Sequence, residues 1–300
     1  MGKPWLIYAL ITTLFWGVWG AFAEFPTRYG FPDTLVYVVW TLTMIPPAVY
    51  AMQRVGWRVQ RDGRSVLLGA LIGFTGAGGQ MLLFHAVHTG PTYLIFPVIA
   101  LSPVVTIALS MVFLRERVTK VGALGVLLAL IALPLFNYSP GEAGGAPAAQ
   151  GVTWFIFASI VLLAWGIQGY FMKLANATMD AENIFLYMTL TSLLLIPVAL
   201  WMTDFSTPIE YGWQGPGLAA ITQILNAVGA LTLVYAFRYG RALVVAPLAN
   251  AGAPMITAIV SMILLGVVPN TVTVIAIVLA FLAAALLAIE PEDKLVEQPV

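Results

Sequence analysis

The 300-residue sequence contains no cysteine and very little charge. The first absence excludes disulfide bonds. Charged residues make up 9% of the chain, against roughly 25% in a soluble globular protein, so they are too few to cover a water-exposed surface. The net charge is zero, which gives no indication of a nucleic-acid partner. With 61% hydrophobic residues, the composition indicates a protein whose solvent is the lipid bilayer.

The sequence also lacks the short motifs of common catalytic and nucleotide-binding sites. It has no GxxxxGK[ST] phosphate-binding loop, no GxSxG nucleophile motif, no GxGxxG dinucleotide motif and no clustered metal-ligand motif. We therefore expect that this chain does not itself hydrolyse ATP, binds no cofactor or metal and is not an enzyme.

Charge-free apolar runs fill the chain, and a spanning helix needs about 20 mostly apolar residues. Two runs are long enough for two spans each, and they divide at the turn signals HTGPT and GVVPNT. The first run is too long for the apolar core of a cleaved signal peptide. The sequence predicts an all-α membrane protein with ten transmembrane helices, at about 5–26, 32–53, 65–87, 92–114, 119–137, 152–172, 182–203, 215–238, 243–265 and 270–289.

The basic residues predict the orientation of these helices, because cytoplasmic loops are rich in Lys and Arg. With the N-terminus inside, ten spans place every Lys and Arg inside except Arg28. We expect an integral protein of the cell inner (cytoplasmic) membrane with both termini in the cytoplasm.

The two halves share residues in one order. Trp16, Gly17 and Gly20 correspond to Trp165, Gly166 and Gly169 at an offset of 149, and further Gly and Pro matches continue at 150 and 151. Because five helices per half is an odd number, the second copy must enter the membrane from the opposite side. The sequence thus predicts two inverted five-helix repeats, an architecture of many secondary transporters. The expected divisions are a first repeat at 1–137, an extracytoplasmic linker at 138–151, a second repeat at 152–289 and a cytoplasmic tail at 290–300.

The sequence resembles the drug/metabolite transporter (DMT) superfamily, and within it the EamA-like transporters. The resemblance is carried by FWGVWG at 15–20, AWGIQG at 164–169 and LSPVVTIALSMVFLRERVT at 101–119. One departure is Val267, which stands where the second repeat of the family usually has a Glu, opposite Glu116 of the first. The resemblance implies a central cavity and export or uptake of small metabolites, and it does not fix a substrate.

Tryptophans and amides inside the spans are the candidate substrate-binding residues. Trp16 and Trp165 lie near mid-helix, although tryptophan prefers the membrane interface. They form either an aromatic wall of a central cavity or helix-packing contacts. An amide buried in hydrocarbon needs a partner or water. Each of the amides therefore lines the substrate route or bonds a neighbouring helix: Gln80, Gln168, Gln223, Asn226 and Asn250.

Two residues are candidates for proton coupling. Glu24 is an acid within a predicted span, and such acids are functional candidates by default. Its alternative is an ion pair with Arg28 at i+4. His85 titrates in a range that suits a proton relay. Its alternative, shared with His88, is an interfacial histidine without a mechanism. A zinc site at these two histidines lacks a third ligand.

The leading hypothesis is a secondary transporter, an exporter or facilitator of small organic metabolites such as amino acids, working by alternating access. The alternatives are a sugar uptake transporter of the same superfamily, a membrane-embedded enzyme using His85, His88 and Glu24, and a non-transporting membrane subunit. A lining poor in Lys and Arg argues against phosphorylated substrates. The expected partners are the lipid bilayer and a small-molecule substrate, with a homodimer left open and no nucleic acid.

Overall fold

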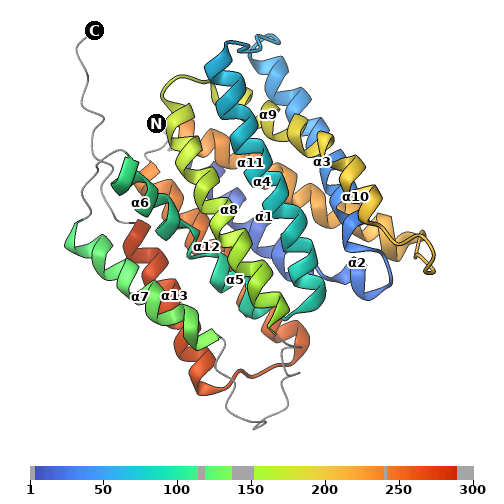
Figure 1. The fold of residues 1–300 in the computed structure, drawn as a ribbon, viewed down its shortest axis with the longest axis vertical. Coiled ribbons are helices and arrows are strands. Elements are labelled where there is room, and N and C mark those ends of the chain that lie inside the picture. The colour runs from blue at the N-terminus through green and yellow to red at the C-terminus, as the bar shows by residue number, and fades with distance from the viewer. Residues whose placement is uncertain (1–3, 114–118, 137–151, 240–241, 289–300) are drawn as a thin grey trace.

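A computed structural model describes residues 4–113, 119–136, 152–239 and 242–288 of the chain. Helices form nearly all of the described part (Figure 1). The first half contains α1 (Pro4–Phe22), α2 (Phe25–Arg28), α3 (Asp33–Arg54), α4 (Gly63–Thr89), α5 (Thr92–Ile99), α6 (Ser102–Phe113) and α7 (Lys120–Phe136). The second contains α8 (Thr153–Asn176), α9 (Ala181–Leu194), α10 (Ile196–Met202), the π-helical turn η1 (Trp213–Gly217), α11 (Leu218–Tyr239), α12 (Ala242–Leu265) and α13 (Thr271–Ala288).

Proline explains two places where one predicted helix is two segments. The helix predicted at 92–114 divides into α5 and α6, and Pro103 is the second residue of α6. The helix predicted at 182–203 divides into α9 and α10, with Pro197 in the first turn of α10. Proline is accepted in the first turn of a helix, but in an interior it clashes with the carbonyl four residues earlier. Each segment therefore restarts at its proline.

Seven helical segments are long and apolar enough to cross a bilayer. Three shorter apolar stretches, in α7, α12 and α13, also occur within the described residues. Large apolar side chains point outward on these helices, including Leu10, Leu130 and Ile263, which are 50%, 58% and 73% exposed. An outer surface of this kind suits lipid. The all-helical, membrane-spanning class is confirmed, whereas the count of ten spans stays a prediction.

The helices pack into two bundles that each combine elements of both halves. Bundle I contains α1 and α3 from the first half with α11 and α12 from the second. Bundle II contains α4 and α6 from the first half with α8 and α9 from the second, whereas α5 packs on both α12 and α8 and lies between the bundles. We call the boundary between them the seam. Helices α7 and α13 pack mainly on each other at one edge of the molecule (Figure 1).

The corresponding helices α1 and α8 run in opposite directions. The chain reverses direction between α1 and α3 and again between α3 and α4. Trp40 in the first half of α3 packs near Phe84 in the last turns of α4, so these two helices are antiparallel. Helix α4 therefore runs in the same direction as α1. Helix α8 begins beside the end of α4, because a side chain at Gly90 would collide with Trp154. Helix α8 thus runs back along α4, against the direction of α1.

Loops from both halves meet at each end of the bundles. At one end, Glu210 N donates to Gly30 O (3.3 Å), which joins the link after α10 to the link before α3. We call this the α2 end. At the other end, the α3–α4 link (55–62) meets the α8–α9 link (177–180), and we call it the Gln60 end. The depth of each site described below is given relative to these two ends.

Candidate functional site

The two predicted mid-helix tryptophans make equivalent bonds. Trp16 Nε1 of α1 donates to the Asn226 carbonyl of α11 (3.1 Å), and Trp165 Nε1 of α8 donates to the Gly76 carbonyl of α4 (3.3 Å). Asn226 and Gly76 are 150 positions apart, and Trp16 and Trp165 are 149 apart. The repeat seen in the sequence is therefore also present in the contacts between helices.

Glycines make these close approaches available. A Cβ atom at Gly229 would lie 2.5 Å from Trp16 Cδ1, and one at Gly79 would lie 2.6 Å from Trp165 Nε1. Each indole brings its Cδ1–Nε1 edge close to a helix backbone only because its partner position has no side chain. Both tryptophans are partly exposed, so their rings have a free part even though their N–H groups are occupied.

A second pair of equivalent bonds was not predicted from the sequence. Thr257 Oγ1 of α12 donates to the Gly17 carbonyl (3.0 Å), and Thr106 Oγ1 of α6 donates to the Gly166 carbonyl (2.8 Å). The two threonines are 151 positions apart and follow the matched prolines Pro103 and Pro254 by three residues. The equal spacing of threonine after proline in the two halves could have predicted this pair of bonds. These bonds hold the Trp-Gly segments of α1 and α8 in the same way within the two bundles.

The predicted amides lie in different surroundings. Gln223 is fully buried, and its Oε1 accepts from Trp19 Nε1 (2.9 Å). Gln80 is 4% exposed and Asn226 is 5% exposed. Gln168 is partly buried and lies against Gly76, at the crossing of α8 and α4. The side chain of Asn250 lies outside the described part of the structure.

The ionisable candidates lie at the α2 end, and each has a partner. Glu24 is 6% exposed and forms the anticipated ion pair with Arg28 (2.8 Å). His85 Nδ1 lies 2.8 Å from Asp33 Oδ2, a contact between residues 52 positions apart that the sequence did not suggest. The ring of His85 also packs edge-on against Phe157 of α8 at 4.6 Å between centroids. Among the described residues, no three His, Asp or Glu side chains are grouped to hold a metal ion.

Hydrogen bonds join the two links at the Gln60 end. The side-chain Oε1 of Gln60 accepts from the backbone N–H of Asp180 (2.8 Å), and the backbone N–H of Gln60 donates to Asn183 Oδ1 (3.0 Å). Tyr187 Oη donates to the Gln60 carbonyl (2.8 Å). Nearby, hydrogen bonds from Ser65 hold the pKa of the Asp62 carboxyl below its usual value. Asp62 thereby caps the first turn of α4, since it accepts from the Ser65 amide at 3.0 Å.

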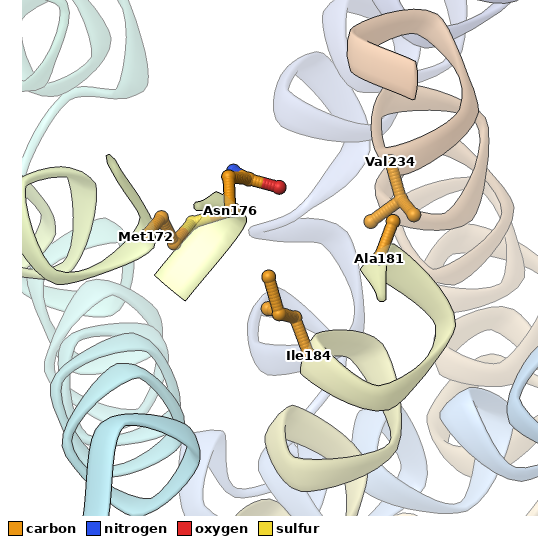
Figure 2. A pocket seen from close by; sticks show the side chains of 5 residues that line it. All are labelled: Met172, Asn176, Ala181, Ile184 and Val234. Atoms are coloured by element: carbon orange, nitrogen blue, oxygen red, sulfur yellow. The ribbon is translucent and has the colours of Figure 1, made fainter. Parts of the chain in front are cut away.

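A small pocket opens on the seam near the Gln60 end (Figure 2). Helix α8 forms one wall, and α9 and α11 form the other. One amide and four apolar side chains surround the opening: Met172, Asn176, Ala181, Ile184 and Val234. The pocket thus lies between the bundles, because α8 and α9 belong to bundle II and α11 to bundle I.

The repeat-related position at the α2 end is closed. At an offset of 150, Phe31, Thr34 and Phe84 correspond to Ala181, Ile184 and Val234. They are 4%, 9% and 1% exposed. The Thr34 hydroxyl also bonds the Thr203 hydroxyl (2.7 Å). The seam therefore has a shallow pocket, about large enough for one water molecule, toward one end and packed aromatic side chains toward the other.

Comparisons with known proteins agree with this architecture. A crystal structure of another protein matches with a TM-score of 0.62 over 93% of this chain and 95% of that chain, at 18% identity, a likeness that shows the fold alone. An uncharacterized protein of Methanocaldococcus jannaschii is 33% identical over 61 residues, which cover 20% of this chain and 44% of that protein. The match thus spans less than half of that relative. The sequence model of the EamA-like transporter family matches residues 3–138 and again residues 152–289. The chain therefore belongs to the EamA-like transporter family, within the DMT superfamily.

Proposed function

We propose that the chain is a secondary transporter, an exporter or facilitator, that moves small organic metabolites such as amino acids across the cytoplasmic membrane by alternating access. The observation that supports this most is the pair of equivalent indole bonds, Trp16 to Asn226 and Trp165 to Gly76, on helices that run in opposite directions. Two bundles built alike but inverted can exchange their arrangements at the two ends of the seam at little cost in free energy.

The full architecture under this proposal has ten transmembrane helices in two inverted repeats. The first repeat is 1–137 and the second is 152–289, joined by an extracytoplasmic linker at 138–151 and followed by a cytoplasmic tail. Exposed Arg54, Arg58, Arg61 and Arg64 lie at the Gln60 end. Because positive charge is retained in the cytoplasm, the Gln60 end is the cytoplasmic end and the α2 end is the extracytoplasmic one.

The substrate route follows the seam. The pocket between α8, α9 and α11 is its cytoplasmic mouth, and Phe31 and Phe84 close it on the other side. Between them, we assign the substrate contacts to Trp16, Trp165, Gln168, Gln80, Asn226, Gln223 and Asn250. Opening the α2 end requires the Thr34–Thr203 bond to break, and closing the Gln60 end requires the pocket walls to meet.

Glu24 and His85 are the proposed residues for proton coupling. While the α2 end is closed, Glu24 pairs with Arg28 and His85 contacts Asp33. Opening of the α2 end would separate these pairs and expose both side chains to the outside solution. Coupling through them would therefore appear as a dependence of transport on the pH outside the cell.

Solute flux in proteoliposomes tests the proposal. Purified protein is reconstituted, and the entry of radiolabelled amino acids and sugars is compared with that in protein-free vesicles. Trp16→Ala is expected to reduce flux, whereas Trp213→Ala, at a position 71% exposed on η1, serves as the matched control. Amino-acid flux supports the proposal, and sugar flux alone would replace its substrate class. If no solute moves while a reaction product forms or a protein partner co-purifies, the proposal is wrong.

A further inference from the structure

Several buried polar atoms lie toward the α2 end without a hydrogen-bond partner among the described residues. They are Trp40 Nε1, Gln80 Nε2 and Gln223 Nε2. Thr41, next to Trp40, is also buried, and its hydroxyl shares a side-chain hydrogen bond with Tyr37. Trp40, Thr41, Gln80 and Gln223 are 5%, 0%, 4% and 0% exposed. We call these four residues the donor layer. A buried polar group without a partner costs free energy, so its presence in a native protein calls for an explanation.

The four residues lie at a similar depth. Counted along α3, α4 and α11 at 1.5 Å per residue, each is about 8 to 14 Å from the helix end that lies at the α2 end. They therefore occupy the same half of the membrane as the closed part of the seam. The pocket mouth lies in the opposite half.

The donor layer borders the seam. The ring of Trp40, in bundle I, packs edge-on toward Phe84, in bundle II (6.5 Å between centroids). Gln80 precedes Phe84 by four residues and so shares its helix face. Gln223 bonds Trp19, whose ring packs edge-on against Phe96 of α5 (5.7 Å), a helix that lies between the bundles.

The repeat relates Thr41 and Gln223 to a pair of residues that lie in contact. At an offset of 150, they correspond to Thr191 and Gly73. In that pair, the Thr191 hydroxyl occupies the space that a side chain at Gly73 would need. Thr191 donates to carbonyls of its own helix, whereas the Thr41 hydroxyl shares a hydrogen bond with Tyr37 of the preceding turn. At the related crossing of α3 and α11, a glutamine therefore stands where the crossing of α9 and α4 has a glycine.

The unpartnered atoms are mainly donors. An indole nitrogen can only donate. Gln223 Oε1 accepts from the Trp19 indole, which fixes the orientation of its amide and leaves a donor, Nε2, unpartnered. Such a layer would be satisfied by oxygen acceptors, whereas an ammonium group has no lone pair to offer an N–H.

We propose that the donor layer binds a carboxylate or carbonyl oxygen of the transported solute and becomes accessible when the α2 end of the seam opens. This proposal rests on the proposed transport function and specifies which part of the solute is recognised. Trp40 and Thr41 are then binding residues in addition to the amides. In the closed arrangement Trp40 Nε1 and the Nε2 atoms of Gln80 and Gln223 are buried without partners among the described residues, which favours opening toward solute and water.

Cysteine labelling tests whether the donor layer becomes accessible, and it needs no added solute. Because the chain has no native cysteine, only the introduced cysteine reacts. Thr41→Cys is compared with Thr207→Cys in an exposed loop and with Thr189→Cys, which replaces a threonine 3% exposed whose hydroxyl bonds its own helix. A membrane-impermeant maleimide is applied from the α2 side. Thr41→Cys is expected to react at about 0.1–10% of the exposed rate, the population of a minor open state. Labelling no faster than at Thr189→Cys would overturn the proposal.

Thermal unfolding of purified protein tests the chemical class. The probes are L-leucine, 4-methylpentanoate and isoamylamine, which share an apolar group and differ in carboxylate and amine. The two carboxylates are expected to raise the unfolding temperature, and isoamylamine is not. Trp40→Phe should raise the half-saturating carboxylate concentration about tenfold or more, the effect of losing a hydrogen bond to a charged group.

The outcomes separate this proposal from the transport function. Stabilisation by isoamylamine alone, by no carboxylate, or equally in Trp40→Phe would overturn the donor layer as a binding site. Solute flux in proteoliposomes would remain intact in each of these cases if the protein is a transporter. If the wild-type protein moves no solute although Thr41→Cys is labelled at the expected rate, the transport function is refuted instead.

Discussion

Replacing each of two buried tryptophans by phenylalanine should change stability by different amounts. Trp19 and Trp40 are 3% and 5% exposed. Trp19 Nε1 donates to Gln223 Oε1, whereas Trp40 Nε1 has no partner among the described residues. The same ring atoms are removed in both variants, so the penalty for the cavity is similar. The difference between the variants therefore isolates the indole N–H.

The magnitude follows from what is left behind. Trp19→Phe removes one hydrogen bond and leaves Gln223 Oε1 buried without its donor, which costs about 1–3 kcal/mol. Bonds between membrane helices average only about 0.6 kcal/mol, so the lower part of this range is expected. Trp40→Phe removes a donor that was already unpaired, and thereby relieves a desolvation cost. We expect Trp19→Phe to be the less stable variant by about 1–3 kcal/mol.

The free energy of unfolding can be measured by titrating SDS into mixed micelles and following helicity by circular dichroism. Wild-type protein and both variants are compared without any added solute. Equal destabilisation by the two substitutions would show that Trp40 Nε1 has a partner in the native protein. The reasoning about the donor layer would then be refuted at its first step.

Three further predictions concern the packing and the loops. Gly79→Ala should destabilise the protein because its Cβ would press on Trp165, whereas Gly78→Ala, with nothing within 4 Å, should stabilise α4 by up to about 1 kcal/mol; SDS unfolding of both variants tests this. Gln60→Ala should lose the two side-chain bonds to the α8–α9 link and raise protease cleavage there; an unchanged cleavage rate would count against a joining role. Asp62→Ala should lower stability at neutral pH. Because the folded-state pKa of Asp62 is lowered, its contribution to stability is present above the usual aspartate pKa and is lost as the pH falls through the folded-state pKa. The unfolding free energies of wild type and variant should therefore converge in acid. A difference that persists in acid would contradict the capping role of Asp62.

The helical class and the repeat could be predicted because they depend on local composition and on punctuation. Trp16 and Trp165 stood out as large aromatic residues beside glycines, and both make the same contact in the fold. The breaks at Pro103 and Pro197 were missed, because a predicted span was treated as one helix whenever its apolar run was continuous.

Contacts between distant residues could not be predicted from one sequence. His85 and Asp33 are ordinary residues of two helix ends, and nothing local indicates that they meet. Trp40 belongs to an apolar helix, and its importance depends on the absence of a partner for its indole N–H among the described residues, which only three-dimensional packing reveals. Gln60 lies in a basic loop that is typical of a solvated link, yet it bonds the other half of the chain.

The exchange of helices between the halves sets an order for assembly during synthesis. Helix α8 finds its partners already inserted, since Trp165 and Gly166 bond residues made 89 and 60 positions earlier. Helix α1 must wait for residues that emerge 204 to 240 positions later. Because chains are made from the N-terminus, the first helix to enter the membrane is among the last to be packed. The ribosome has almost finished the protein before Gly17 and Gly20 of α1 can pack against α12.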